Sequence, residues 1–97
     1  MNKLYAGDRT IDGIVVTVDG EPLDTYADIK HYSRNGFEWS YEGAAPTQLA
    51  YAILVDHLGD TAKAARLAST FMRTVVSNFQ NEWQMSSVDI DRMLQQL

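Results

Sequence analysis

The strongest local structural signal in the chain is the run Gly13-Ile14-Val15-Val16-Thr17-Val18-Asp19-Gly20-Glu21-Pro22-Leu23. Its first half is rich in β-branched side chains, which suit the pleated surface of a strand. The Asp19-Gly20 pair that follows is typical of a two-residue type I′ turn, because glycine accepts a positive φ. Pro22 has no backbone N–H, so the return strand belongs at a sheet edge or ends early. The run therefore predicts a β-hairpin.

The segments on either side of this hairpin extend the predicted sheet. Lys3–Asp8 alternates side chains in the manner of a strand that precedes the hairpin. Residues 24–36 fit either one helical turn or an irregular loop. Phe37–Tyr41 alternates aromatic and polar side chains with a period of two. That alternation predicts a half-buried strand with its three aromatic side chains on one face.

The second half of the chain carries helical signals. Pro46 is typical of a helix start, and Gly59 of a left-handed helix end, so we expect a helix over Thr47–Leu58. Asp60 is the expected N-cap of a second helix, which the apolar spacing extends over Thr61–Phe79. The first of these helices is expected to bury one apolar stripe. That stripe comprises Leu49, Ala50, Ile53, Leu54, His57 and Leu58.

The last predicted helix follows a short connection. We place Trp83 and Met85 in this connection, and Ser86 or Ser87 at the N-cap. Strands come first and helices after, which predicts an α+β fold. In this fold a small N-terminal antiparallel sheet of three or four strands packs against two or three C-terminal helices. We expect a single domain over residues 1–97, with mainly strands and turns in 1–45 and mainly helices in 46–97.

Composition and charge exclude several classes of function. The chain has 97 residues, no cysteine, and a formal net charge of −5. Disulfides and cysteine-bound metals are therefore excluded. The acidic balance argues against direct nucleic-acid binding, which normally needs a basic face. No apolar run approaches the roughly 20 residues of a membrane span, and no apolar leader begins the chain, so we expect a cytoplasmic protein.

The central stretch Gly36–Leu54 reads G-F-E-W-S-Y-E-G-A-A-P-T-Q-L-A-Y-A-I-L. It resembles the core G-F-E-W-G-Y-x-G-S-G-P-A-Q-L-A-L-A-I-L of a domain-of-unknown-function family of small bacterial, archaeal, phage and plasmid proteins. Tyr5-x-Gly7-x-Arg9, the run 18–23, Trp83-x-Met85 and the pair 89–90 also resemble that family. Ser40 and Ala45 replace glycines of the family pattern, which indicates a less demanding backbone turn here. The resemblance implies an accessory protein of mobile elements and no particular activity.

An acidic run around the hairpin return suggests a surface for a protein partner. We expect Asp19, Glu21, Asp24 and Asp28 to form this surface, with Tyr26 as an aromatic anchor. Carboxylates steer association with a basic protein groove. The hypothesis is a non-enzymatic interaction module, an inhibitor or modulator of the anti-CRISPR type. It would dock on a basic, nucleic-acid-handling protein.

Two alternatives remain open at this stage. Glu38, Tyr41, Glu42 and Gln48 could line a pocket for a small molecule, or the site of a small enzyme. Self-association through the last helix and Trp83 is a third hypothesis.

The residues suggest neither a cofactor nor a metal site. The two histidines, His31 and His57, match no metal-binding or triad spacing, and His57 is interpreted as a packed core residue. The acidic run around the hairpin also lacks the spacing of a calcium loop.

Overall fold

The computed structural model describes residues 2–97 and has an α+β fold. Strands β1 (Leu4–Thr10), β2 (Gly13–Val18) and β3 (Glu21–Pro22) follow one another along the chain. A fourth strand, β4 (Trp83–Ser86), comes much later and pairs with β1. The sheet order is β3-β2-β1-β4, and every neighbouring pair is antiparallel.

The predicted hairpin at Asp19-Gly20 is confirmed. Asp19 and Gly20 have φ values of 51° and 83°, the left-handed pair that a type I′ turn requires. β3 lies at the edge of the sheet and ends at Pro22, as the missing N–H predicts.

The predicted strand over Phe37–Tyr41 is wrong, because this segment forms no strand in the structure. Its three aromatic side chains do not share one environment. Trp39 is fully buried and Phe37 partly buried, whereas Tyr41 is half exposed. The backbone reverses at Ser40, which has a φ of 79°. The turn therefore still needs a left-handed backbone, and the expectation of a less demanding turn was wrong.

The prediction that Trp83 and Met85 lie in a connection is wrong, because both belong to strand β4. Both side chains are buried on the inner face of the sheet, while Gln84 between them is exposed. Only this short W-Q-M alternation signals a strand, and it becomes stable by pairing with β1, some 80 residues earlier in the chain. The C-terminal half of the chain thus completes the sheet that its N-terminal half begins.

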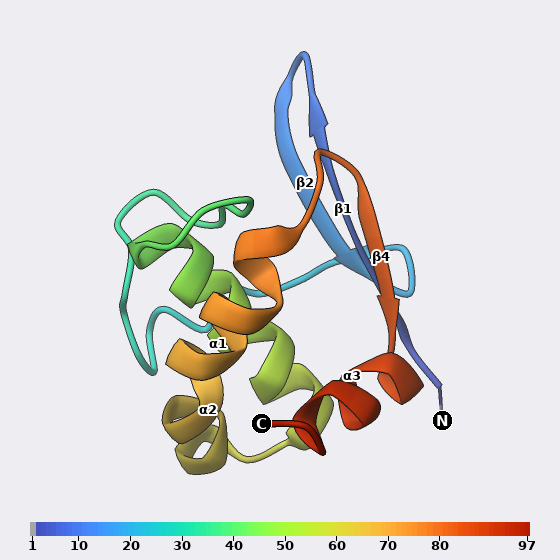
Figure 1. Cartoon of the computed structure of the whole chain (residues 1–97). Helices are drawn as coiled ribbons and strands as arrows, with labels where there is room; N and C mark the ends of the chain where they lie inside the picture. Colours follow the sequence, from blue (N-terminus) through green and yellow to red (C-terminus); the bar gives the residue numbers. More distant parts are fainter. Residues whose placement is uncertain (1) are drawn as a thin grey trace.

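Three α-helices pack on one side of the sheet (Figure 1). They are α1 (Ala44–Leu58), α2 (Thr61–Thr74) and α3 (Ser87–Leu94). α1 starts three residues before the predicted Thr47, and Gly59 ends it with a φ of 67°, as expected. Asp60 caps α2 by accepting a hydrogen bond from the Lys63 N–H at 3.0 Å.

The second helix is shorter than its apolar spacing predicts. α2 ends at Thr74, and a short 3₁₀ turn, Val76–Asn78, follows it. The break falls at successive β-branched residues, which crowd a helix. Val76 and Phe79 still pack in or against the core, so the predicted apolar side chains are correct although the helix is not.

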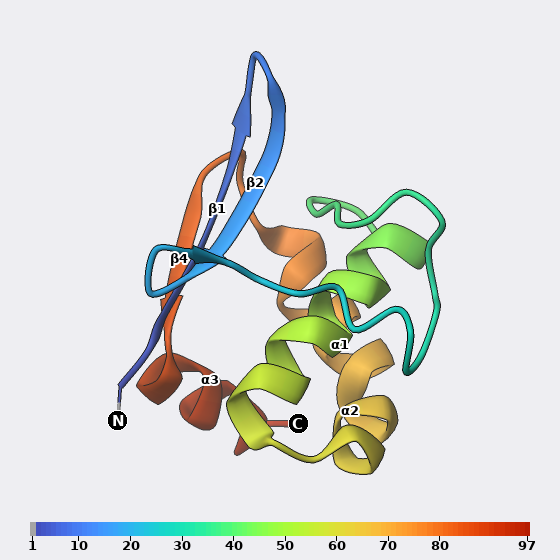
Figure 2. The same ribbon diagram turned by 180° about the vertical axis from the view of Figure 1, so that it is seen from behind.

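α1 lies at the centre of the molecule, between the sheet, α2 and the loop of residues 24–43 (Figure 2). Every residue from Gln48 to Val55 is buried. The predicted stripe residues Leu49, Ala50, Ile53 and Leu54 are fully buried, and burial extends around the helix beyond that stripe. His57, the polar member of the stripe, has a side chain that is only 11% exposed, as expected of a packed histidine, and its Nε2 atom lies 2.6 Å from Asp91 of α3.

The N-cap of α3 is Ser86, one of the two serines predicted for that position. The Ser86 hydroxyl accepts a hydrogen bond from the Asp89 N–H, and the Asp89 carboxylate accepts one from the Ser86 N–H. These two bonds hold the pKa of Asp89 below its usual range. No helix in residues 2–97 is long and apolar enough to cross a membrane.

Candidate interaction surfaces

The four carboxylates of the predicted acidic surface are all exposed. Asp19 accepts a hydrogen bond from the Leu4 N–H, and Asp24 accepts one from the Tyr26 N–H, each at 2.9 Å. These two carboxylates therefore also fix the local backbone. Glu21 and Asp28 make no side-chain hydrogen bond within residues 2–97, and none of the four forms an ion pair there.

These carboxylates form a row rather than a compact patch. The segment that carries them starts at the turn beside the sheet and crosses the molecule past α1 (Figure 2). Its two ends lie near different tyrosines. Burial raises the pKa of Tyr5, and the charge of Asp19 adds to that shift. Burial also raises the pKa of Tyr51 on α1, and there the charge of Asp28 adds to the shift. We call these four residues, from Asp19 to Asp28, the acidic row, because their carboxylates are spread along an extended segment.

The Tyr26 side chain is less exposed than we expect of an aromatic anchor. It is partly buried and packs against the core. Its backbone has a φ of 55°, so the chain turns sharply at this residue. Burial raises the pKa of its hydroxyl, and the nearby carboxylates of Asp56 and Asp24 add to that shift.

The structure does not gather Glu38, Tyr41, Glu42 and Gln48 around one cavity. Gln48 is fully buried and its amide group makes four hydrogen bonds. Its oxygen accepts from the backbone N–H groups of Tyr32 and Ser33, and its nitrogen donates to the carbonyls of Thr25 and Lys30. Gln48 thus binds the loop of residues 25–33 to α1. Both polar atoms of its amide group are engaged in these bonds, so neither is left for a ligand.

Glu38 is held by Arg9 of β1 in a partly exposed ion pair. The Arg9 Nη2 atom lies 2.7 Å from Glu38 Oε1 and also donates to the Trp39 carbonyl at 2.7 Å. The guanidinium carbon lies 4.7 Å from the centre of the Trp39 ring. Tyr41 and Glu42 are exposed on the following turn. The pair therefore joins the loop to the sheet.

Three of the segments quoted for the family resemblance, at residues 5–9, 36–54 and 83–85, meet in one structural cluster. Tyr5, Gly7 and Arg9 all face the inner side of the sheet, because alternate residues of a strand share a face. A side chain at Gly7 would overlap the indole ring of Trp83. Trp83 in turn stacks on Phe79, with 4.3 Å between ring centres. Trp83 is thus buried inside the chain instead of serving as an exposed contact for another copy.

A second inner-face group centres on the carboxylate of Asp56 in α1. Tyr5 donates its hydroxyl hydrogen to Asp56 at 2.6 Å, and the Lys3 ammonium group lies 3.0 Å from the same oxygen. Burial of Tyr5, followed by this hydrogen bond and the Asp56 charge, raises its pKa well above the usual range. The Tyr5 hydroxyl, the Lys3 ammonium group and the Asp56 carboxylate thus bind one another, which indicates a structural role.

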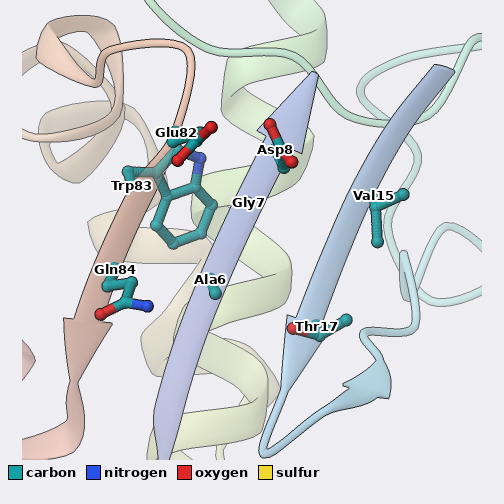
Figure 3. Close-up of a pocket in the computed structure, with 8 residues that line it drawn as sticks. All are labelled: Ala6, Gly7, Asp8, Val15, Thr17, Glu82, Trp83 and Gln84. Carbon is teal, nitrogen blue, oxygen red and sulfur yellow. The ribbon is translucent and has the colours of Figure 1, made fainter. Parts of the chain in front are cut away.

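The outer face of the sheet is the open surface of the molecule. No helix covers it in either view (Figures 1 and 2). Figure 3 shows a depression on this face, between β4, β1 and β2, with Asp8 and Glu82 at the same end. It has a volume of about 510 Å³. Its lining comprises Ala6, Gly7, Asp8, Val15, Thr17, Glu82, Trp83 and Gln84.

This depression was not among the predicted sites. Its lining holds two carboxylates and no cationic side chain. β1 and β2 were predicted, so the alternation of Ala6, Asp8, Val15 and Thr17 could have placed these side chains on one face. Glu82 and Gln84 were missed because β4 was missed. The W-Q-M alternation is the one local signal that could have identified them.

Charge is distributed unevenly between the sheet and the helices. Within residues 2–97, three of the thirteen side-chain carboxylates pair with lysine or arginine and Asp91 contacts His57, while the other nine do neither. Most of the unpaired carboxylates lie on the sheet or in the segment that follows it. In contrast, α2 carries Lys63, Arg66 and Arg73, none of which forms an ion pair within the described residues. The sheet side is therefore the acidic side.

The residues that the structure describes hold no group of three or more potential metal ligands. His31 is exposed, and His57 pairs with a single carboxylate. The side-chain polar groups of Gln48, Arg9 and Asp56 are engaged within the chain, whereas the buried indole N–H groups of Trp39 and Trp83 have no hydrogen-bond partner among the described residues. The features that remain available to a partner are the acidic row, the open sheet face and the free edges of the sheet.

Comparison with known families assigns the chain. A family of unknown function, DUF6166, matches residues 5–96. This chain belongs to that family. The match covers nearly the whole structure, from β1 to the end of α3. No curated protein and no solved structure matches the chain.

Proposed function

We propose that this member of DUF6166 is a non-enzymatic protein-interaction module that docks on a basic protein partner. The unpaired carboxylates on the sheet side carry this proposal. Charges that are not compensated within a chain attract a partner of opposite charge and raise its association rate. The partner class that fits best is a nucleic-acid-handling protein, because such proteins present basic grooves. Occupying the groove would make the module an inhibitor or modulator.

The internal polar groups support a binding role over a catalytic one. A catalytic site needs groups free to touch a substrate, commonly in a cleft. The amide of Gln48 and the ion pair of Arg9 with Glu38 are instead engaged in holding loops to the core. No observation favours the small-molecule alternative, because its four residues do not share a cavity.

The test is capture of partners from a host lysate at low and high salt, with identification by mass spectrometry. We expect a basic, nucleic-acid-handling protein that is retained at low salt and lost at high salt. Competition with nucleic acid for the captured partner would establish that the module covers its groove. Capture that does not depend on salt would contradict the electrostatic mechanism.

A matched pair of variants makes this test specific to the acidic row. Glu21→Gln/Asp28→Asn removes two negative charges and leaves the turn-forming bonds of Asp19 and Asp24 intact. Gln95→Lys/Gln96→Lys changes the net charge by the same amount at the exposed end of the chain. We expect weaker capture by the first variant and normal capture by the second. Equal loss in both would mean that net charge, and not the row, drives binding.

A further inference from the structure

The two sides of strand β2 are paired very differently. On one side β2 pairs with β1 along its whole length, from Gly13 to Val18. On the other side β3 covers only Thr17 and Val18, because the return strand ends at Pro22. The first half of β2 therefore has a free edge.

The register identifies the backbone groups on this free edge. The Leu23 N–H donates to the Val16 carbonyl at 3.0 Å, so Val16 directs its backbone toward the β3 side. Alternate residues of an antiparallel strand direct their N–H and C=O to the same side. Ile14 therefore presents both groups outward at the edge, with no partner within residues 2–97.

An apolar groove adjoins this edge. It has a volume of about 720 Å³ and lies between β2, the end of β3 and the loop that reaches Phe37. Its apolar lining includes Ile14, Val16, Pro22, Leu23 and Phe37, and no charged residue lines it. Ile14 is 38% exposed, so an incoming side chain can contact it.

Acidic residues flank the groove on the chain segments that line it. Asp12 precedes Gly13, Glu21 precedes Pro22, and Asp24 follows Leu23. None of these three carboxylates forms an ion pair within the described residues. On the opposite wall, Arg34 precedes Asn35 and is the one cation placed in the same way, so the carboxylates outnumber it. An occupant with apolar side chains toward the groove and basic side chains at its ends would match both features.

We propose that the free edge of β2 accepts an extended segment of a protein partner as an added strand. The segment would exchange backbone hydrogen bonds with Ile14 and place an apolar side chain in the groove beside Phe37. Its flanking lysine or arginine side chains would face the three carboxylates. In strand addition of this kind, backbone hydrogen bonds provide the affinity and the contacts of alternate side chains provide the specificity. This proposal rests on the proposed function and names how the basic partner binds.

A second copy of the chain is a poorer occupant than a basic segment. Pairing two β2 edges would bring the carboxylates near Gly13 and Pro22 of both copies together. Each copy already carries a net charge of −5. In addition, β3 shields Thr17 and Val18 in both copies, which leaves little edge to share.

The first measurement is amide hydrogen exchange by NMR on the unmodified protein. Ile14 should exchange fast, whereas Val15, which faces Asp8 of β1 in a hydrogen-bonded register, should exchange slowly. The probe is the peptide acetyl-Lys-Val-Lys-Val-Lys-Val-Lys-amide. At saturation it should slow exchange at Ile14 by about tenfold or more. Slow exchange at Ile14 in the free protein, or peptide binding without protection at Ile14, would overturn the proposal.

The second measurement removes the edge donor. Ile14→Pro deletes the N–H that faces the free edge and leaves the β1 ladder intact, since proline is tolerated on strand edges. Ile14→Val keeps the N–H and is the matched control. We expect Ile14→Pro to weaken peptide binding about tenfold, and Ile14→Val to leave it nearly unchanged. If Ile14→Pro fails to fold, Phe37→Ala tests the groove instead, with the same expected loss.

A control peptide with proline at the central position should bind weakly, because it cannot form the strand. Equal binding of both peptides would overturn strand addition in favour of charge alone. A dimer in light scattering that is abolished by Ile14→Pro would overturn the choice of occupant. If lysate capture is salt-dependent but insensitive to Ile14→Pro, this inference fails while the proposed function stands. If no basic partner is captured, the proposed function fails, and the peptide experiment still reports on the edge.

Discussion

Helix α1 and strand β2 are both apolar in sequence, yet α1 is buried and β2 is largely exposed. α1 is covered by the sheet, by α2 and by the loop of residues 24–43, so that all eight residues from Gln48 to Val55 are buried. In β2 only Val16 is buried, while Ile14 and Val15 remain exposed. An apolar run thus shows that a segment can be buried, and the elements that pack around it decide whether it is buried. The exposed apolar run is the one available to a partner.

Truncation in the two elements should give the largest contrast in stability. Ile53→Ala in α1 removes a fully buried side chain and should lower the free energy of unfolding by about 2–5 kcal/mol. Val15→Ala removes a side chain that is 49% exposed on the open face, and should change stability by about 0.5 kcal/mol or less. Urea denaturation of both variants measures the difference. Similar losses would mean that the outer face is covered in solution.

The buried amide of Gln48 offers the next test. Gln48→Glu keeps the shape but replaces the donor that serves the Thr25 and Lys30 carbonyls, and it places a carboxyl group in the core. We expect a loss of about 2–4 kcal/mol, because unsatisfied buried polar groups are costly. Hydrogen exchange should show the loop of residues 24–33 losing protection before α1 does. A uniform loss of protection would show that this loop does not open separately from α1.

Gly7 lies where the open sheet meets the core, and its substitution should have an intermediate effect. A methyl group there overlaps the indole ring of Trp83, which is held by Phe79 and Trp39. Gly7→Ala should therefore destabilise the protein by about 1–3 kcal/mol and change the tryptophan fluorescence. Ala6→Gly on the opposite face is the control and should leave the fluorescence unchanged. A neutral Gly7→Ala would mean that Trp83 repacks freely.

Alkaline pH should have the smallest effect of the four. The raised pKa of Tyr5 means that the folded protein holds this proton above pH 10, where an unfolded tyrosine loses it. The contribution of neutral Tyr5 is thus complete below about pH 10 and decreases as pH rises. The slope from this one group is at most about 1.4 kcal/mol per pH unit. Tyr5→Phe should reduce the alkaline slope measured by denaturation, and the raised pKa values of Tyr26, Tyr32 and Tyr51 should leave a residual slope in this variant.

The sequence predicted those features that depend on adjacent residues. The Asp19-Gly20 turn, the edge position of Pro22, the helix end at Gly59 and the caps at Asp60 and Ser86 are all confirmed. Each follows from a local backbone preference or a hydrogen bond that spans a few residues. The candidate acidic residues were likewise recognisable, because charged side chains remain exposed unless they are paired.

The features that the sequence did not predict depend on contacts between distant segments. Phe37–Tyr41 has the alternation of a strand, but Arg9 holds Glu38 and the Trp39 carbonyl, and the backbone turns at Ser40. β4 has too short an alternation to stand out, and it forms because β1 offers a free edge. The depression with Asp8 and Glu82 exists only once these two strands are side by side.

The hairpin, the helix boundaries near Gly59 and Ser86 and the excess of acidic side chains can all be read from the chain, because they follow from local geometry and composition. The burial of α1 on all sides, the packing of Trp83 against Gly7 and the free edge at Ile14 arise only in the folded molecule. These depend on which segments meet in space. Burial and long-range hydrogen bonding depend on contacts between distant segments, so they do not follow from the order of adjacent residues.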